Sequence, residues 1–109
     1  MAASETLHIV EIPFESGAMR YRYSRRMHPD GTQWIRHGRF VAYHESGAMA
    51  SEGDYLDGHE EGPWRDYHPN GRIASEGYYR AGKEEGLWRF YTTDGREERS
   101  VAYHDGRQA

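Results

Sequence analysis

The sequence contains no cysteine, only four prolines and no long apolar run. Without cysteine, the chain has no disulfide framework, no thiol nucleophile and no cysteine-based metal site, which suits a reducing compartment. No stretch approaches the length of a membrane span or the apolar core of a signal peptide. We therefore expect a cytoplasmic protein.

Large aliphatic residues are also scarce, whereas the chain has nine tyrosines, three tryptophans and 13 glycines. The apolar area available for a core thus comes mainly from flat aromatic rings with a polar tip, which suit the surface of a sheet. At 109 residues the chain is long enough for one domain but too short for a deep core. We expect a single repeat domain over residues 1–109, with residues 1–6 as a frayed tail.

The formal net charge of −4 disfavours a general nucleic-acid or anionic-membrane binder. The charge is unevenly distributed. Residues 20–39 carry six arginines and one acid, Asp30, whereas residues 45–61 contain several acids and no lysine or arginine. This bipolar pattern favours a charge-complementary protein partner. For the arginine-rich hairpin two interpretations stay open: plain cross-strand pairing, or a stacking platform for single strands in which Tyr21, Tyr23 and Trp34 alternate with arginines.

The chain repeats itself with a fixed period, equal to the distance in sequence from Gly38 to Gly62. The unit over residues 60–83 contains Gly62, Trp64, Tyr67, Gly71 and Tyr79. The counterparts one period earlier are Gly38, Phe40, Tyr43, Gly47 and Tyr55, and those one period later are Gly86, Trp88, Tyr91, Gly95 and Tyr103. A fixed period of this size indicates a supersecondary unit that buries its apolar face by stacking on copies of itself.

Turn signals and strand-length segments alternate along the whole chain. The signals are Ser16-Gly17, Asp30-Gly31, Ser46-Gly47, Asn70-Gly71 and Asp94-Gly95, and no stretch has a helical apolar period. We predict an all-β fold: an open antiparallel meander of stacked β-hairpins, with about eight strands in a single twisted sheet. Residues 36–59, 60–83 and 84–107 are the regular repeats, and residues 7–35 are degenerate N-terminal hairpins.

Two-residue turns predict a specific register. They place Trp64 opposite Gly77, Tyr67 opposite Ala74, and Tyr21 opposite Phe40. An indole opposite a strand glycine would cover the backbone that the glycine leaves bare. The connections over residues 57–62 and 81–86 are expected to be solvated loops, which would carry the acidic pairs Glu60-Glu61 and Glu84-Glu85.

The motif Gly62-x-Trp64-x-x-Tyr67-x-x-x-Gly71, followed by Tyr79-x-x-Gly82, resembles the MORN repeat, specifically the MORN-variant repeats of small bacterial proteins, some classed as antitoxins. The resemblance covers roughly residues 36–107 and is specific because three units keep phase. The chain departs from the pattern at Phe40, which replaces a tryptophan in the first unit, and at Glu97 and Val101 in the third. The resemblance implies an extended β-hairpin array that binds a partner and has no catalytic activity.

Candidate catalytic and metal sites are weak. The seven histidines include no pair with the i, i+4 spacing of a helical zinc site. Adjacent carboxylates in solvated loops lack the burial that shifts the pKa of catalytic carboxyl groups. We therefore expect no enzyme activity, no catalytic residue, no metal site and no cofactor.

We predict instead a protein-binding surface. Tyrosine and tryptophan often contribute most of the binding energy at interfaces, although the same rings are the only core available. The predicted binding residues are Phe40, Tyr55, Trp64, Tyr67, Tyr79, Trp88, Tyr91, Glu60, Glu61, Glu84 and Glu85. The leading hypothesis is an antitoxin or immunity protein that masks a toxin through an aromatic sheet face and acidic loops. The alternative is a scaffold that acts by homo-oligomerisation or at a membrane-proximal complex.

Overall fold

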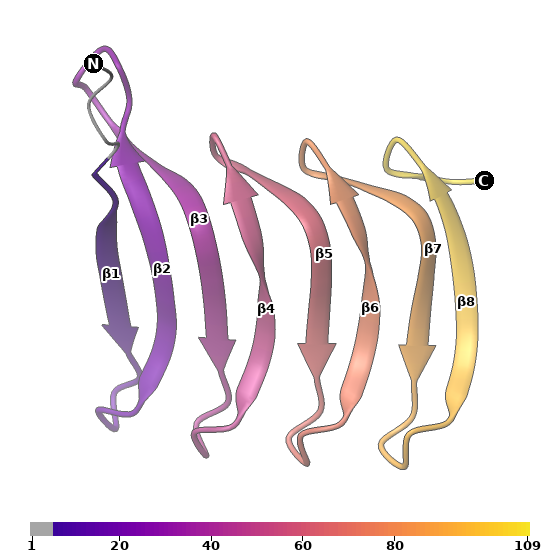
Figure 1. Ribbon diagram of the computed structural model, residues 1–109. Coiled ribbons are helices and arrows are strands. Elements are labelled where there is room, and N and C mark those ends of the chain that lie inside the picture. Colours follow the sequence, from indigo (N-terminus) through magenta and orange to yellow (C-terminus); the bar gives the residue numbers. More distant parts are fainter. Residues whose placement is uncertain (1–5) are drawn as a thin grey trace.

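The structure is a computed structural model that describes residues 6–109, so the tail expected over residues 1–6 lies, apart from Thr6, outside the described residues. The chain forms one open sheet in which each strand pairs antiparallel with the next strand in sequence (Figure 1). This confirms the predicted all-β meander. The strands are β1 (His8–Pro13), β2 (Met19–Met27), β3 (Trp34–Tyr43), β4 (Met49–Leu56), β5 (His59–Tyr67), β6 (Ile73–Arg80), β7 (Lys83–Tyr91), β8 (Glu97–His104) and β9 (Arg107–Gln108).

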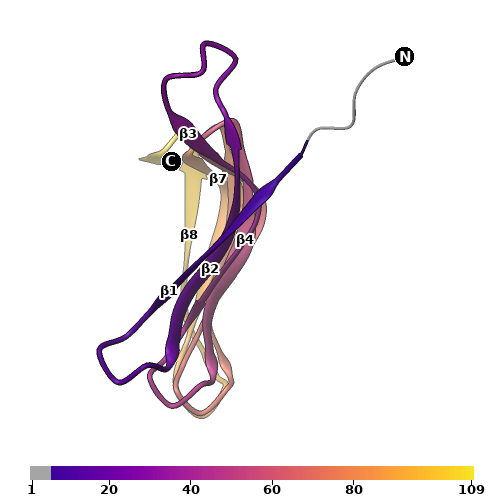
Figure 2. The same ribbon diagram turned by 90° about the vertical axis from the view of Figure 1, so that its left-hand side faces the viewer.

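Seen along its edge, the sheet is a single bowed layer (Figure 2). No helix packs on either face within residues 6–109. The radius of gyration is 15.9 Å, larger than the roughly 13 Å of a compact domain of similar length. Any core must therefore form on the surface of the sheet itself.

The hairpin turn at Asn70-Gly71 is one residue longer than predicted. The Gly71 N–H donates to the His68 carbonyl (2.9 Å), the His68 N–H donates to the Arg72 carbonyl (2.8 Å), and Gly71 has a φ of 89°. This is the pattern of a three-residue loop that closes on a left-handed glycine. Tyr67 consequently pairs with Ile73 instead of Ala74, before a register shift restores the predicted Trp64–Gly77 pair.

The connections between repeats are tight turns, so the prediction of solvated loops at residues 57–62 and 81–86 is wrong. Asp57 and Gly58 have φ values of 49° and 91°, and Leu56 pairs directly with His59. Ala81 and Gly82 form the same two-residue turn. Because two positive φ angles suffice to reverse the chain, Glu60 and Glu61 lie within β5, and Glu84 and Glu85 lie within β7.

A bulge interrupts each of the strands β3, β5 and β7. Residues 62–64 of β5 face Gly53 alone, and residues 86–88 of β7 face Gly77 alone. The equivalent bulge in β3 contains Gly38 at a φ of 97°. It shifts the pairing by two residues, so Tyr21 faces Ala42 and Tyr23 faces Phe40, and the predicted Tyr21–Phe40 pair is wrong.

The bulges in β5 and β7 place the indoles of Trp64 and Trp88 on glycines of the preceding strands. The buried apolar residues are Phe40, Trp64 and Trp88, which are 8%, 9% and 6% exposed. A Cβ atom on Gly53 would lie 2.2 Å from the Trp64 indole, and one on Gly77 would lie 2.0 Å from that of Trp88. The expected ring-on-glycine contact thus exists, but Trp64 covers Gly53 of the preceding repeat and not Gly77, the residue opposite it on β6.

Candidate functional site: two faces of one sheet

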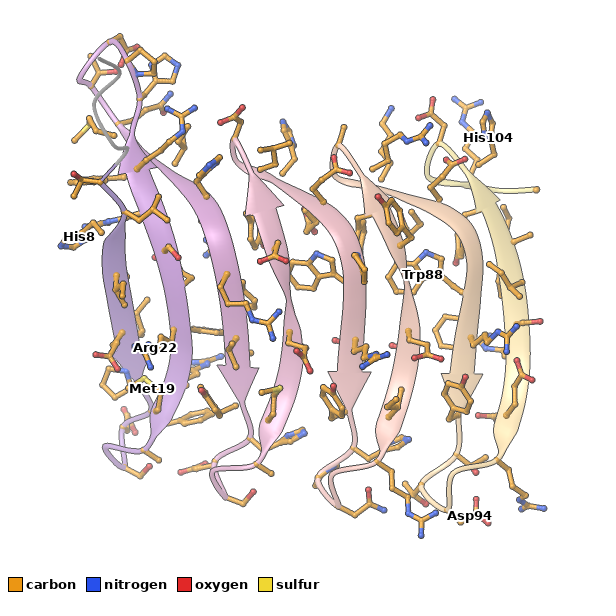
Figure 3. The ribbon with its side chains drawn as sticks, viewed as in Figure 1. His8, Met19, Arg22, Trp88, Asp94 and His104 are labelled. Carbon is orange, nitrogen blue, oxygen red and sulfur yellow. The ribbon has the colours of Figure 1, made fainter. Side chains whose placement is uncertain are left out.

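One face of the sheet carries a continuous chain of rings, which we call the aromatic face: Phe40, Tyr55, Trp64, Tyr79 and Trp88. Successive ring centroids in this chain are 5.0 to 5.8 Å apart. All four contacts are edge-to-face, an arrangement that aromatic pairs favour. Trp88, labelled in Figure 3, projects from β7 toward β6. The two tryptophans therefore point to the same side of the sheet.

The indole N–H groups of Trp64 and Trp88 both donate hydrogen bonds within the protein. The Trp64 Nε1–H donates to the Asp54 carbonyl (3.1 Å), and the Trp88 Nε1–H donates to the Tyr78 carbonyl (3.2 Å). Together with their low exposure, these bonds make the tryptophans structural residues that offer little surface to a partner. The half-buried tyrosines beside them, Tyr55, Tyr79 and Tyr103, present more surface.

Acidic side chains alternate with these tyrosines across the strands. Tyr55 pairs with Glu60, and Tyr79 pairs with Glu84. Directly paired residues on neighbouring antiparallel strands project to the same face, so the two glutamates share the aromatic face. We call this set the tyrosine–glutamate row: Tyr55, Glu60, Tyr79, Glu84 and Tyr103.

The electrostatics of the row are dominated by negative charge. Burial raises the pKa of Tyr79 to about 12, and the nearby carboxylates of Glu84, Glu60 and Asp66 add to this effect. Asp66 is held in place by hydroxyl groups of Ser51 and Ser75. The tyrosine hydroxyl therefore lies in a field that favours a cation.

The opposite face carries a row of alternating charges, which we call the ladder face: Glu52, Arg65, Glu76 and Arg89. Each of these residues pairs directly with the next across β4 to β7. Arg65 Nε lies 3.3 Å from Glu76 Oε2, and Arg39 also pairs with Glu52.

Two of the predicted binding residues belong to the ladder face. The Tyr67 hydroxyl donates to Glu52, and the Tyr91 hydroxyl donates to Glu76 Oε1 (2.9 Å). Tyr67 and Tyr91 are thus brought together with the charge ladder and not with the tryptophans. No single surface presents all eleven predicted residues.

A substitution at Glu52 is expected to make stability less sensitive to acid. The hydrogen bond from the Tyr67 hydroxyl, aided by Arg39, holds the pKa of Glu52 below its ordinary value of 4.5. Because this pKa is lower in the folded than in the unfolded state, the carboxylate stabilises the fold above about pH 4.5, and this stabilisation is lost as the pH falls through the folded-state value. We expect Glu52→Gln to cost on the order of 1 kcal/mol at pH 7 and almost nothing near pH 2, measured by urea unfolding across pH.

The matched control is Asp54→Asn on the same strand. The Asp54 carboxylate makes no hydrogen bond or ion pair within residues 6–109, so this substitution removes a charge but no contact. Equal pH profiles for the two variants would contradict the role given to the Tyr67–Glu52 bond.

Glu61 and Glu85 hold neighbouring repeats together at the end of the strands where the two-residue turns lie. Glu61 Oε1 accepts from the Ala81 N–H (3.1 Å), and Glu85 Oε2 accepts from the Asp105 N–H (2.8 Å). The Asp105 N–H and His104, which is labelled in Figure 3, lower the pKa of Glu85. These two carboxylates therefore have a structural role at the joins between repeats.

His44 and His68 also link neighbouring repeats, at the opposite end of the strands. The Nε2 atoms of His44 and His68 lie 2.8 and 2.9 Å from the carbonyl oxygens of Tyr67 and Tyr91. No three metal-ligating side chains come together anywhere in residues 6–109.

Most arginines of the hairpin over residues 20–39 contact groups of the protein itself. Arg26 pairs with Asp57, Arg25 lies 4.3 Å from the Trp34 ring centroid, and Arg20 lies over Phe14. Arg36 extends over three rings, two of which belong to the aromatic face. These contacts support the cross-strand interpretation and leave few free cations for a nucleic-acid backbone.

Arg36 and Tyr103 are not among the predicted binding residues, although both side chains lie on the aromatic face. Arg36 was grouped with the other arginines by composition, although its place one period before Glu60 indicates an equivalent position. Tyr103 follows Tyr79 by the same interval, so the period itself contained the signal.

Two consecutive stretches, residues 36–57 and 60–81, match the family described as the MORN repeat variant. The third expected unit, residues 84–107, lies outside these matches. MORN repeats are a non-enzymatic type of repeat and in general bind proteins or membranes. No curated protein matches the chain, and no helix in the described residues has the length and apolarity to cross a membrane.

Proposed function

We propose that this protein is a non-catalytic binding protein that acts as an antitoxin or immunity protein by masking a partner protein with its aromatic face. The observation that carries the proposal is the tyrosine–glutamate row, a set of half-buried rings and carboxylates on a sheet face that no other described element covers. A rigid sheet loses little conformational entropy on binding, which favours tight masking.

The binding residues proposed here differ in their roles from those expected at the outset. Tyr55, Tyr79, Glu60 and Glu84 form the contact surface, while Phe40, Trp64 and Trp88 support it from below. Tyr67 and Tyr91 lie on the ladder face, and Glu61 and Glu85 tie the repeats together. Masking would therefore depend on the tyrosines and glutamates more than on the tryptophans.

The test is co-expression with the products of the genes that flank this one. We expect the wild-type protein to restore growth in the presence of a toxic neighbour and to co-purify with it. The variant Tyr55→Ala/Tyr103→Ala, checked for folding by circular dichroism, should lose at least about tenfold in affinity, because aromatic side chains dominate interface energies.

A matched control removes two large side chains, one tyrosine and one leucine, from the ladder face. Tyr78 and Leu87 are 44% and 49% exposed there, and Tyr78→Ala/Leu87→Ala should keep the partner. The proposal is overturned if no neighbouring product is neutralised, or if the ladder-face variant loses the partner while the aromatic-face variant retains it.

A second candidate function, assembly by self-association, is supported by the ladder face. A two-fold axis parallel to the strands would pair Glu52 with Arg89, and Arg65 with Glu76, of a second copy, with Leu87 nearby. Light scattering of the free protein separates the two candidates. A concentration-independent monomer counts against assembly.

A further inference from the structure

Arg36, Glu60 and Glu84 occupy the same position in successive repeats, one period apart. In the first repeat the Arg36 guanidinium carbon lies 4.7 Å from the Tyr23 ring centroid, 5.6 Å from that of Phe40 and 5.4 Å from that of Tyr55. Arg36 Nη1 also donates to the Tyr55 hydroxyl (3.3 Å). The chain thus places its own guanidinium on the rings of this repeat.

The next two repeats lack such a cation. Within residues 6–109 no arginine or lysine lies over Trp64, Tyr79, Trp88 or Tyr103, and the carboxylates of Glu60 and Glu84 make no hydrogen bond or ion pair. Instead of a guanidinium, a carboxylate stands beside the rings at each equivalent position. Ring faces attract cations and not anions, so these repeats hold two unpaired charges that favour an external cation.

We propose that the tyrosine–glutamate row binds arginine side chains of a partner protein, with a guanidinium placed against Tyr79 between Glu60 and Glu84. In this arrangement the bound arginine takes the place in the later repeats that Arg36 takes in the first. The proposal rests on the proposed function, since it names the chemistry of the segment that the aromatic face recognises.

Arginine fits this surface better than lysine for two reasons. Its planar guanidinium stacks on aromatic rings and donates two parallel hydrogen bonds to one carboxylate, whereas a lysine ammonium is a strongly hydrated point charge. Glu60 and Glu84 lie on strands two apart in the sheet, which corresponds to roughly 9–10 Å. Alternate side chains of an extended segment can therefore reach both carboxylates.

The test uses a synthetic peptide of glycine and serine with arginine at every second position, titrated by NMR and calorimetry. Two matched peptides carry lysine or citrulline at the same places. We expect the arginine peptide to shift the signals of Tyr79 and Tyr103, the lysine peptide to bind more weakly, and the neutral citrulline peptide not to bind. Equal binding of the citrulline peptide, or no binding of the arginine peptide, would overturn the proposal.

Two double variants locate the site. Glu60→Gln/Glu84→Gln should weaken binding of the arginine peptide at least about tenfold, as expected for the loss of two ion pairs. Glu15→Gln/Glu45→Gln removes the same charge from two exposed turns at the opposite edge of the sheet and should leave the affinity unchanged. Equal losses of affinity in both double variants would show that binding depends on the net charge and not on this site, and would contradict the proposal.

A third variant copies the first repeat into the second. Glu60→Arg should place a guanidinium over Trp64 and Tyr79, raise the melting temperature by about 2–5 °C through the new cation–π contact, and abolish peptide binding. A variant that is destabilised and still binds the peptide would contradict the equivalence of the two positions.

The outcomes separate this inference from the proposed function. If the arginine peptide binds but no flanking product is masked, arginine recognition stands and the antitoxin role falls. If a partner is masked through the aromatic face but the citrulline peptide binds as well as the arginine peptide, the antitoxin role stands and this inference falls.

Discussion

Replacing Trp88 with alanine is expected to lower the free energy of unfolding by about 3–5 kcal/mol, the usual cost of removing a large buried aromatic side chain. Trp88 is 6% exposed, makes an edge-to-face contact with Tyr79 and donates to the Tyr78 carbonyl. Since small proteins have only about 5–15 kcal/mol of stability in total, the variant should be close to unfolding at room temperature. Urea denaturation followed by circular dichroism measures the effect.

The third tryptophan provides the control. Trp34 is 44% exposed and contacts Arg25 and His8 at the end of the sheet. Trp34→Ala should cost about 1 kcal/mol or less, as for an exposed cation–π contact. Similar losses for the two variants would mean that the buried rings of the aromatic face do not form the core.

The second large effect is expected from one methyl group. Gly77→Ala would place a Cβ 2.0 Å from the Trp88 indole, a separation that no real contact tolerates. The ring must shift away from β6, and overpacking of this kind costs about 1–3 kcal/mol or more. The same urea measurement applies, and the near-ultraviolet circular dichroism of the tryptophans should change with it.

The double variant Gly77→Ala/Trp88→Ala tests the cause. Without the indole the added methyl group has space, so Gly77→Ala should then be neutral, or stabilising by about 0.5–1 kcal/mol, because alanine restricts the unfolded chain more than glycine. The two substitutions should thus be strongly non-additive. Additive losses would show that Gly77 is required for some reason other than the ring.

The sequence predicted the parts of this structure that depend on period and alternation. The fixed period placed Trp64 and Trp88 on one face, and the predicted Trp64–Gly77 pair is confirmed. Side chains alternate between the two faces along a strand, so position in the sequence decides the face as long as no residue is inserted between the tryptophan and the turn.

The parts that were missed depend on inserted residues. The sequence predicts no bulge at Gly38 and places Gly62 in a solvated loop, yet each adopts a positive φ within a bulge. Neither a turn dipeptide nor an apolar pattern marks such a site. The bulges decide that Trp64 lies on Gly53, and they allow Glu60 and Glu61 to lie in β5. The proposed arginine-binding position was hidden for a related reason, since its residue type changes from Arg36 to Glu60 while its place in the repeat does not.

The valine on β8 restricts how such an array can grow. Val101 pairs with Trp88 where the two earlier repeats have Gly53 and Gly77 in the corresponding place. A further indole could not lie on β8, because the valine side chain fills the space that a glycine leaves open. Duplication of one repeat unit is therefore compatible with the joins before β5 and β7, while β8 closes the series of ring-on-glycine contacts.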